Sequence, residues 1–205
     1  MNKIKIINKI SIFIIGFFTT ITVFLLILSL FSFLNLLKIS QNKIGVINII
    51  IPFLLCLCTG IWEEIVFRKF LFGKLNTKLK SFWLSCLLTS LLFSVCHYPN
   101  IGYNYISFFS YLLGGVVYCV TFLRSKTIIY PISIHVAWNY SQFLFSLPMS
   151  SGINDGFFKI GFSNKNLLFF GTYGIENGLV SILIRLVILI FCYYIIKLLP
   201  KIFLY

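Results

Sequence analysis

The chain has 205 residues, of which 60% are hydrophobic and only 10% charged, and its formal net charge is +13. Soluble domains carry about 25% charged residues, so this composition excludes a soluble globular protein and indicates a membrane protein that crosses the bilayer several times. The basic residues lie at the ends of apolar runs rather than on one aromatic-rich face. That placement is typical of helix orientation and of contact with anionic lipid headgroups, and it argues against nucleic-acid binding.

Six apolar runs predict an all-α fold of about six membrane-spanning helices in a single domain, residues 1–205. The runs are residues 10–37, 44–72, 82–98, 105–123, 131–147 and 178–199. The first run is longer than the apolar region of a signal peptide, and no cleavage site of small residues follows it. We therefore interpret it as a transmembrane helix.

Polar and glycine-containing stretches predict the connections between these runs. Gly73 and Asn76 act as helix breakers in this interpretation. The predicted connections are a polar turn at 38–43, a basic interfacial loop at 69–80 and a long outer loop at 150–177.

Prolines and glycines give further local predictions. Pro52 predicts a kink in the second helix, and Pro99 predicts the end of the third. Pro131 suits the first turn of the fifth helix. Gly114 and Gly115 would let a neighbouring helix pack closely against the fourth.

The distribution of charge predicts the orientation of the chain. With the amino terminus in the cytoplasm, twelve Lys and Arg side chains fall in cytoplasmic segments and four in outer segments, while Arg185 lies within the last run. Cytoplasmic segments of membrane proteins carry the excess of basic residues, so both termini are predicted to be cytoplasmic.

The cysteines show no metal-binding or disulfide pattern. All six fall in apolar runs without a Cys-x-x-Cys pair, and we expect them to be small buried hydrophobic residues. They are Cys56, Cys58, Cys86, Cys96, Cys119 and Cys192.

Two adjacent carboxylates, Glu63 and Glu64, and the nearby Arg68 lie at the end of the second run. Glu64 and Arg68 are four residues apart, so they share one face of a helix and can form an ion pair. Glu63 is rotated by about 100° from Glu64 and is left free to face a polar cavity. Intramembrane carboxylates are costly and indicate function, although both could simply balance the basic charges at the membrane surface.

The only two histidines lie on other runs. His97 follows Phe93 by four residues, and His135 precedes Asn139 by four, which places each pair on one helical face. Taken singly, each pair could be a packing or interfacial feature. Together with Glu63, these polar groups on three helices would be stable only if they face one another or water. A general base, a histidine that positions water and two donors for an oxyanion would make a hydrolase; a glutamate and two histidines could equally hold a catalytic zinc ion.

The three motifs resemble those of the CAAX protease and bacteriocin-processing family (CPBP, also called Abi) of intramembrane endopeptidases. That family carries Glu-Glu-x-x-x-Arg, Phe-x-x-x-His and His-x-x-x-Asn in this order, as the chain does between Glu63 and Asn139. The resemblance covers about residues 56–147 and gives Glu64 and Arg68 a structural or assisting role. Lys69 stands where the first motif usually continues with glycine.

The resemblance implies an intramembrane peptidase in which Glu63 and His97 activate water, while His135 and Asn139 stabilise the oxyanion. Family members are described both as metalloproteases and as glutamate-dependent proteases. A Zn²⁺ ion held by Glu63, His97 and His135 is therefore one of two open mechanisms. The implied substrates are membrane-anchored peptides or proteins, and the implied bacterial roles are bacteriocin or pheromone maturation, self-immunity and surface-protein display. Cleavage of prenylated CAAX ends is the eukaryotic role.

Two other functions remain open from the residues. A binding or immunity membrane protein could keep the fold and use the polar cluster for recognition. A small transporter could use the same groups as a proton relay, but the runs show no inverted-repeat pattern, which disfavours this function.

Overall fold

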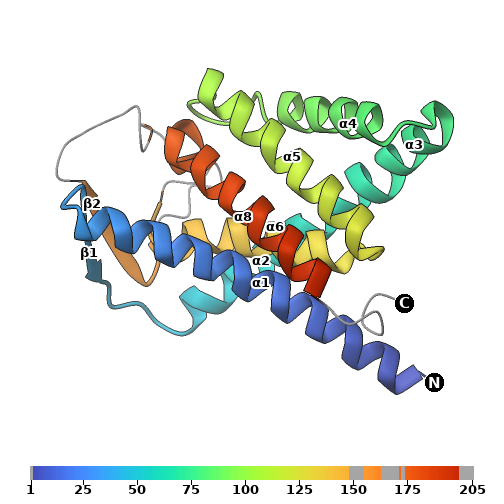
Figure 1. Ribbon diagram of the computed structural model, residues 1–205. Helices are drawn as coiled ribbons and strands as arrows, with labels where there is room; N and C mark the ends of the chain where they lie inside the picture. Colours follow the sequence, from blue (N-terminus) through green and yellow to red (C-terminus); the bar gives the residue numbers. More distant parts are fainter. Residues whose placement is uncertain (1, 148–154, 163–170, 172–173, 199–205) are drawn as a thin grey trace.

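The apolar runs form long helices in the computed structural model, which describes residues 2–147, 155–162, 171 and 174–198 (Figure 1). The described residues also form a π-helix (η1), a 3₁₀ helix (η2) and two short strands. The elements are α1 Asn2–Phe33, β1 Leu37–Gln41, α2 Ile47–Glu64, η1 Ile65–Phe72, α3 Gly73–Leu79, α4 Phe82–Cys96, α5 Tyr105–Ser125, α6 Ile129–Leu144, β2 Phe158–Phe162, η2 Ile175–Asn177 and α8 Leu179–Leu198.

Within the described residues, four helical segments are long and apolar enough to cross a membrane, so the structure supports a helical membrane protein but does not confirm the predicted six spans. These segments are Lys9–Phe33, Ile47–Leu79, Tyr105–Ser125 and Leu179–Leu198. At 15 residues, α4 is about 22 Å long, shorter than the hydrocarbon core of about 30 Å. The 16-residue α6 is also short, and it is buried among other helices.

The centre of the bundle is α6, which is buried along almost its whole length between Tyr130 and Phe143. Gly60 of α2 makes close packing possible there, because a Cβ at this position would lie 2.8 Å from the Val136 side chain. At the interface of α4 and α5, a Cβ on Gly115 would lie 2.7 Å from the Ser90 Cβ. The predicted role of Gly115 in close helix packing is therefore confirmed, and small residues let these helices approach one another.

The predicted loop at 69–80 is wrong, because the helix that begins at Ile47 continues through η1 and α3 to Leu79. Gly73 is helical, with φ −56° and ψ −48°. Phe72 packs edge-on against Phe82 and Phe122, and this burial offsets the helix cost of glycine, which is about 1 kcal/mol. The chain turns instead at Lys80, which is left-handed with φ 50°.

The predicted turn at 38–43 and the predicted loop at 150–177 are also partly wrong. Strands β1 and β2 pair in antiparallel fashion, with Leu37 opposite Phe162 and Gln41 opposite Phe158. The Asn42 side chain extends this link by donating a hydrogen bond to the Gly156 carbonyl at 3.0 Å. The connection between α1 and α2 is therefore tied to the segment between α6 and α8.

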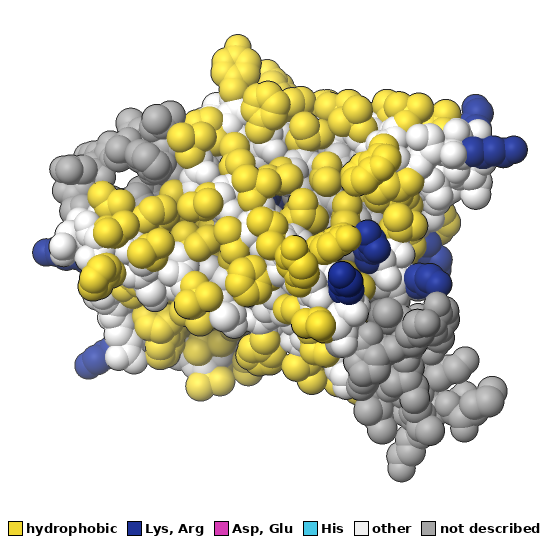
Figure 2. Space-filling model, in the orientation of Figure 1, with side chains coloured by type: hydrophobic (Ala, Val, Ile, Leu, Met, Phe, Trp, Pro, Cys, Tyr) yellow, Lys and Arg dark blue, Asp and Glu magenta, His cyan; other side chains and the backbone are white. Residues whose placement is uncertain are grey.

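The outer surface of the helices is apolar. Figure 2 shows one face covered by hydrophobic side chains, with Lys and Arg mostly toward its two ends, as a lipid-facing surface requires. Cys58 and Cys96 are exposed, so the expectation that all six cysteines are buried is wrong for these two. An apolar side chain in a membrane helix can face lipid as readily as protein.

Candidate active site

Between Pro52 and Phe72, every fourth residue of the long helix is buried in the bundle interior. The buried positions in α2 and η1 are Pro52, Cys56, Gly60, Glu64, Arg68 and Phe72. In a straight α-helix, residues four apart drift around the axis, because one turn holds 3.6 residues. The wider i→i+5 turns of η1 allow the four-residue spacing to continue inward, and such π-helical segments are frequent at functional sites.

Glu64 and Arg68 form a fully buried ion pair on this stripe. The Arg68 Nε lies 3.2 Å from the Glu64 Oε2, and both side chains are 0% exposed. The guanidinium also packs over aromatic faces, with its Cζ 4.5 Å from the Phe93 ring centroid and 4.8 Å from that of Tyr118. Arg68 Nη2 donates to the Gly115 carbonyl at 3.4 Å. The pair is thus enclosed by α4 and α5, while the neighbouring Lys69 is exposed.

Glu63 lies between the two histidines. Its Oε2 is 3.8 Å from the His97 Nε2 and 3.7 Å from the His135 Nε2. Glu63 and His97 retain 21% and 18% exposure, whereas His135 is 5% exposed. The helices therefore bring together the three groups that the sequence placed on separate runs.

The opposite edge of each histidine ring is held by a fixed acceptor. His97 Nδ1 lies 2.7 Å from the Phe93 carbonyl oxygen, and His135 Nδ1 lies 2.8 Å from the Glu64 Oε1. A carbonyl oxygen only accepts and an ionised carboxylate only accepts, so both Nδ1 atoms carry the proton. In the neutral rings, each Nε2 then presents a lone pair to Glu63.

Glu63 Oε2 is buried and has no hydrogen-bond partner among the described residues. Two imidazole lone pairs and a carboxylate oxygen at 3.7–3.8 Å repel one another unless a donor or a cation lies between them. This arrangement suits a water molecule that donates to Glu63 or to a histidine.

Two tyrosines of α5 hold the histidine rings in place. Tyr111 stacks on His97 with ring centroids 4.2 Å apart, and Tyr118 stacks on His135 at 4.7 Å. The two tyrosines are seven residues apart and therefore lie on one face of α5. Neither tyrosine was predicted as a site residue, although two aromatic residues at this helical spacing are visible in the sequence.

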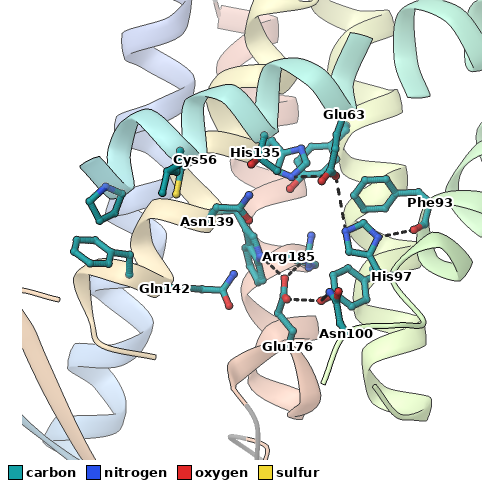
Figure 3. A pocket seen from close by; sticks show the side chains of 17 residues that line it. Cys56, Glu63, Phe93, His97, Asn100, His135, Asn139, Gln142, Glu176 and Arg185 are labelled. Carbon is teal, nitrogen blue, oxygen red and sulfur yellow. Dashed lines mark hydrogen bonds and ion pairs between the residues drawn. The ribbon is translucent and has the colours of Figure 1, made fainter. Parts of the chain in front are cut away.

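These groups line a cavity of about 310 Å³ inside the bundle (Figure 3). Asn139 projects into it from α6, one helical turn beyond His135. All six predicted site residues thus lie in or directly beside one site. The residues that line the cavity include Glu63, Phe93, His97, Asn100, Tyr111, Tyr118, His135, Trp138, Asn139, Gln142, Glu176 and Arg185.

A second charged cluster, which was not predicted from the sequence, lies in the same cavity. Glu176 of η2 accepts hydrogen bonds from the Tyr111 hydroxyl at 2.5 Å, from Trp138 Nε1 at 2.8 Å and from Arg185 Nη2 at 3.1 Å. Arg185 also stacks over Trp138, with its Cζ 3.7 Å from the ring centroid. Arg185 stood alone in an apolar run, and a buried arginine needs a counter-charge. With Glu63 and Glu64 already placed, only Asp155 and Glu176 remained in the sequence as partners.

Glu63, His97 and His135 form the first cluster of the cavity. Their residue types match those of catalytic zinc sites, which combine histidines and a carboxylate with an open position for water. Their spacing does not make a coordination sphere, however. Among the residues that the structure describes, no group of three His, Cys, Asp or Glu side chains is placed to hold one metal ion. As placed, these side chains can act on water directly.

The fold and the cavity define a class: a helical membrane protein with a carboxylate, two histidines and an amide gathered inside the bundle. Residues 45–141 match a family model described as type II CAAX prenyl endopeptidase Rce1-like. This segment contains all three motifs, and the match agrees with their resemblance to the CAAX protease and bacteriocin-processing family. The match supports a CAAX-type intramembrane endopeptidase in general terms. Neither a curated protein nor a solved structure matches the chain.

Proposed function

We propose that this protein is an intramembrane endopeptidase that hydrolyses peptide bonds in membrane-anchored peptides or proteins. The observation that carries the proposal is the position of the Glu63 carboxylate, whose unpartnered oxygen lies within 4 Å of both histidine Nε2 atoms. A general base must reach its proton directly or through one water molecule, and this geometry allows it.

The first step is the activation of water. Glu63 accepts a proton from a water molecule that His97 Nε2 orients, and the hydroxide attacks the carbonyl carbon of the scissile peptide bond. The hydrogen bond from His97 Nδ1 to Phe93 and the stack on Tyr111 fix the ring for this task. Glu63 later returns the proton to the leaving amine, so the carboxylate is regenerated.

The second requirement is stabilisation of the oxyanion. The Asn139 amide donates one hydrogen bond, and His135 donates another when its Nε2 carries a proton. The Glu64 carboxylate at His135 Nδ1 supplies the counter-charge for that protonated ring. Glu64 and Arg68 thus act on the reaction through His135 rather than by contact with the substrate.

A metal-dependent mechanism is the alternative within the same function. Glu63, His97 and His135 would be the ligands of a Zn²⁺ ion, which would supply Lewis-acid activation of water. Small shifts of the side chains would be needed, because their present spacing is not that of a coordination sphere.

A non-catalytic immunity or binding protein of the same fold is the second candidate function. Glu63 and His97 are partly exposed in a cavity that also contains apolar and charged walls, and such a cavity could bind a peptide without cleaving it. This function needs the shape of the site but not a general base.

The decisive experiment measures peptide cleavage by the purified protein in detergent, with a library of peptides anchored by a lipid chain. Wild type is compared with Glu63→Gln, which keeps the shape and removes the base. We expect a loss of about 10²–10⁴-fold in rate. Equal cleavage by both proteins would overturn the assignment of Glu63, and no cleavage together with protection of cells by Glu63→Gln would favour the immunity function.

A chelator added to the wild type separates the two mechanisms. Activity that persists supports the glutamate mechanism. Activity that is lost and restored by Zn²⁺ supports ligation by Glu63, His97 and His135. Unfolding temperatures of all samples show whether the protein remains folded.

A further inference from the structure

Gln142 presents a buried amide to the catalytic cavity. It lies on α6, seven residues after His135 and three after Asn139, so all three share one helical face. Figure 3 shows the side chains of Asn139 and Gln142 on the same side of the cavity. Gln142 is 2% exposed and lines the cavity wall.

The carbonyl end of this amide has no partner. Gln142 Oε1 is buried and lacks a hydrogen-bond donor among the described residues. An unpaired buried acceptor costs free energy, and the large majority of buried side-chain polar atoms have a partner. An acceptor that the protein leaves without a donor gains a hydrogen bond when a ligand supplies an N–H.

Apolar side chains line the same cavity. Pro52, Leu55 and Cys56 of α2 and Phe143 of α6 belong to its wall. In Figure 3, Cys56 and Gln142 lie toward one end of the cavity, and Glu63 and His97 toward the other. A cavity end that combines apolar side chains with the Gln142 amide suits an extended peptide, whose main-chain amides need partners while its side chains meet apolar surface.

We propose that Gln142 is a substrate-binding subsite that accepts a main-chain N–H of an extended peptide. The proposal rests on the peptidase function above. Seven residues of helix separate Gln142 from His135 by about 10 Å along α6. An extended chain advances about 3.3 Å per residue, so the amide bound by Gln142 belongs to a residue about three positions from the scissile bond. Gln142 lies one position beyond the segment that matches the family model.

The test uses one cleaved peptide of twelve residues with an N-terminal palmitoyl chain, and a set in which each main-chain amide in turn is N-methylated. Gln142→Met removes both polar ends of the amide and keeps the approximate shape. We expect kcat/KM on the unmodified peptide to fall about tenfold in this variant, mostly through KM. In the wild type, one N-methyl peptide, modified about three residues from the scissile bond, should show a similar loss.

The proposal is tested by combining the Gln142→Met substitution with the N-methylated peptide. If Gln142 binds that N–H, then N-methylation at this position costs the Gln142→Met variant nothing further, and the two losses are not additive. Additive losses, or an equal response of both proteins to every N-methyl peptide, would overturn the subsite.

Two controls isolate the subsite from the fold and from the chemistry. Ser141 is also buried, and its Oγ has no partner in the part of the chain that the structure describes, but it does not line the cavity, so Ser141→Ala should leave the pattern of N-methyl effects unchanged. Binding of the same peptides by Glu63→Gln measures recognition without cleavage. Failure of the wild type to cleave any peptide counts against the proposed function, whereas uniform binding of all N-methyl peptides by Glu63→Gln counts against the subsite alone.

Discussion

Tyr111 stacks on His97 with ring centroids 4.2 Å apart and planes inclined by 26°, while its hydroxyl donates a hydrogen bond to Glu176. One side chain of α5 therefore contacts both charged clusters of the cavity. The same residue thus packs against the His97 ring and supplies a hydrogen-bond donor to Glu176. A change at Tyr111 should accordingly affect the position of the His97 ring and the anchoring of η2 in separable ways.

Tyr111→Phe keeps the stack on His97 and removes the hydrogen bond to Glu176, whereas Tyr111→Ala removes both. We expect the Phe variant to retain most of its kcat and to lose about 1–3 kcal/mol of stability, because a buried hydrogen bond to a charged group is lost. The Ala variant should lose a further tenfold or so in kcat/KM, since the His97 ring is no longer held. Cleavage assays and thermal unfolding in detergent check both effects. Equal kcat/KM for the two variants would show that the stack does not position His97.

Glu64→Gln should be among the most destabilising conservative changes in the chain. It leaves the fully buried Arg68 without a counter-charge, and breaking such a pair costs about 3–5 kcal/mol. The double variant Glu64→Gln with Arg68→Met removes both charges and should recover much of that loss. Unfolding temperatures of the single and double variants measure the difference. Recovery of stability without recovery of cleavage would show that Glu64 also serves His135.

The Glu176–Arg185 pair should respond asymmetrically to substitution. Arg185 is 4% exposed, whereas Glu176 is 19% exposed and has two other donors in Tyr111 and Trp138. Glu176→Gln therefore leaves a buried cation uncompensated and should cost about 3 kcal/mol. Arg185→Met leaves a carboxylate that keeps two hydrogen bonds and should cost about 1 kcal/mol. Thermal unfolding distinguishes the two, and equal losses would contradict the assigned difference in burial.

Gly115→Ala tests the close approach of α4 and α5. The added methyl would lie 2.7 Å from the Ser90 Cβ and 2.8 Å from its Cα, so the two helices must separate. We expect a loss of about 1–3 kcal/mol and reduced activity, because α4 carries Phe93 and ends next to His97. Gly45→Ala is the matched control, since a Cβ there meets nothing within 4 Å. Equal unfolding temperatures for both variants would show that this interface tolerates the methyl group.

The sequence by itself determined that the chain is a helical membrane protein and that Glu63, His97 and His135 belong to one cluster. Charged and imidazole groups are so costly in an apolar environment that their presence in several apolar runs of one chain indicates a shared site. The spacing of four between Glu64 and Arg68 likewise determined their ion pair, because residues that far apart share one helical face. Glu63, one residue earlier, could be assigned to the cavity by the same helical rotation.

The tertiary structure alone decided which of the remaining groups join the cavity. Glu176 lies in what looked like a loop, and no local pattern ties it to Tyr111, Trp138 and Arg185, since these contacts come from three helices. The continuation of the helix through Gly73 and the pairing of β1 with β2 also depend on packing between segments far apart in the chain. Local propensities are worth about 1 kcal/mol or less per residue, and burial of neighbouring side chains overrides them. Residue chemistry thus identified the polar groups that meet in the candidate site, and long-range packing decided the walls of the cavity around them.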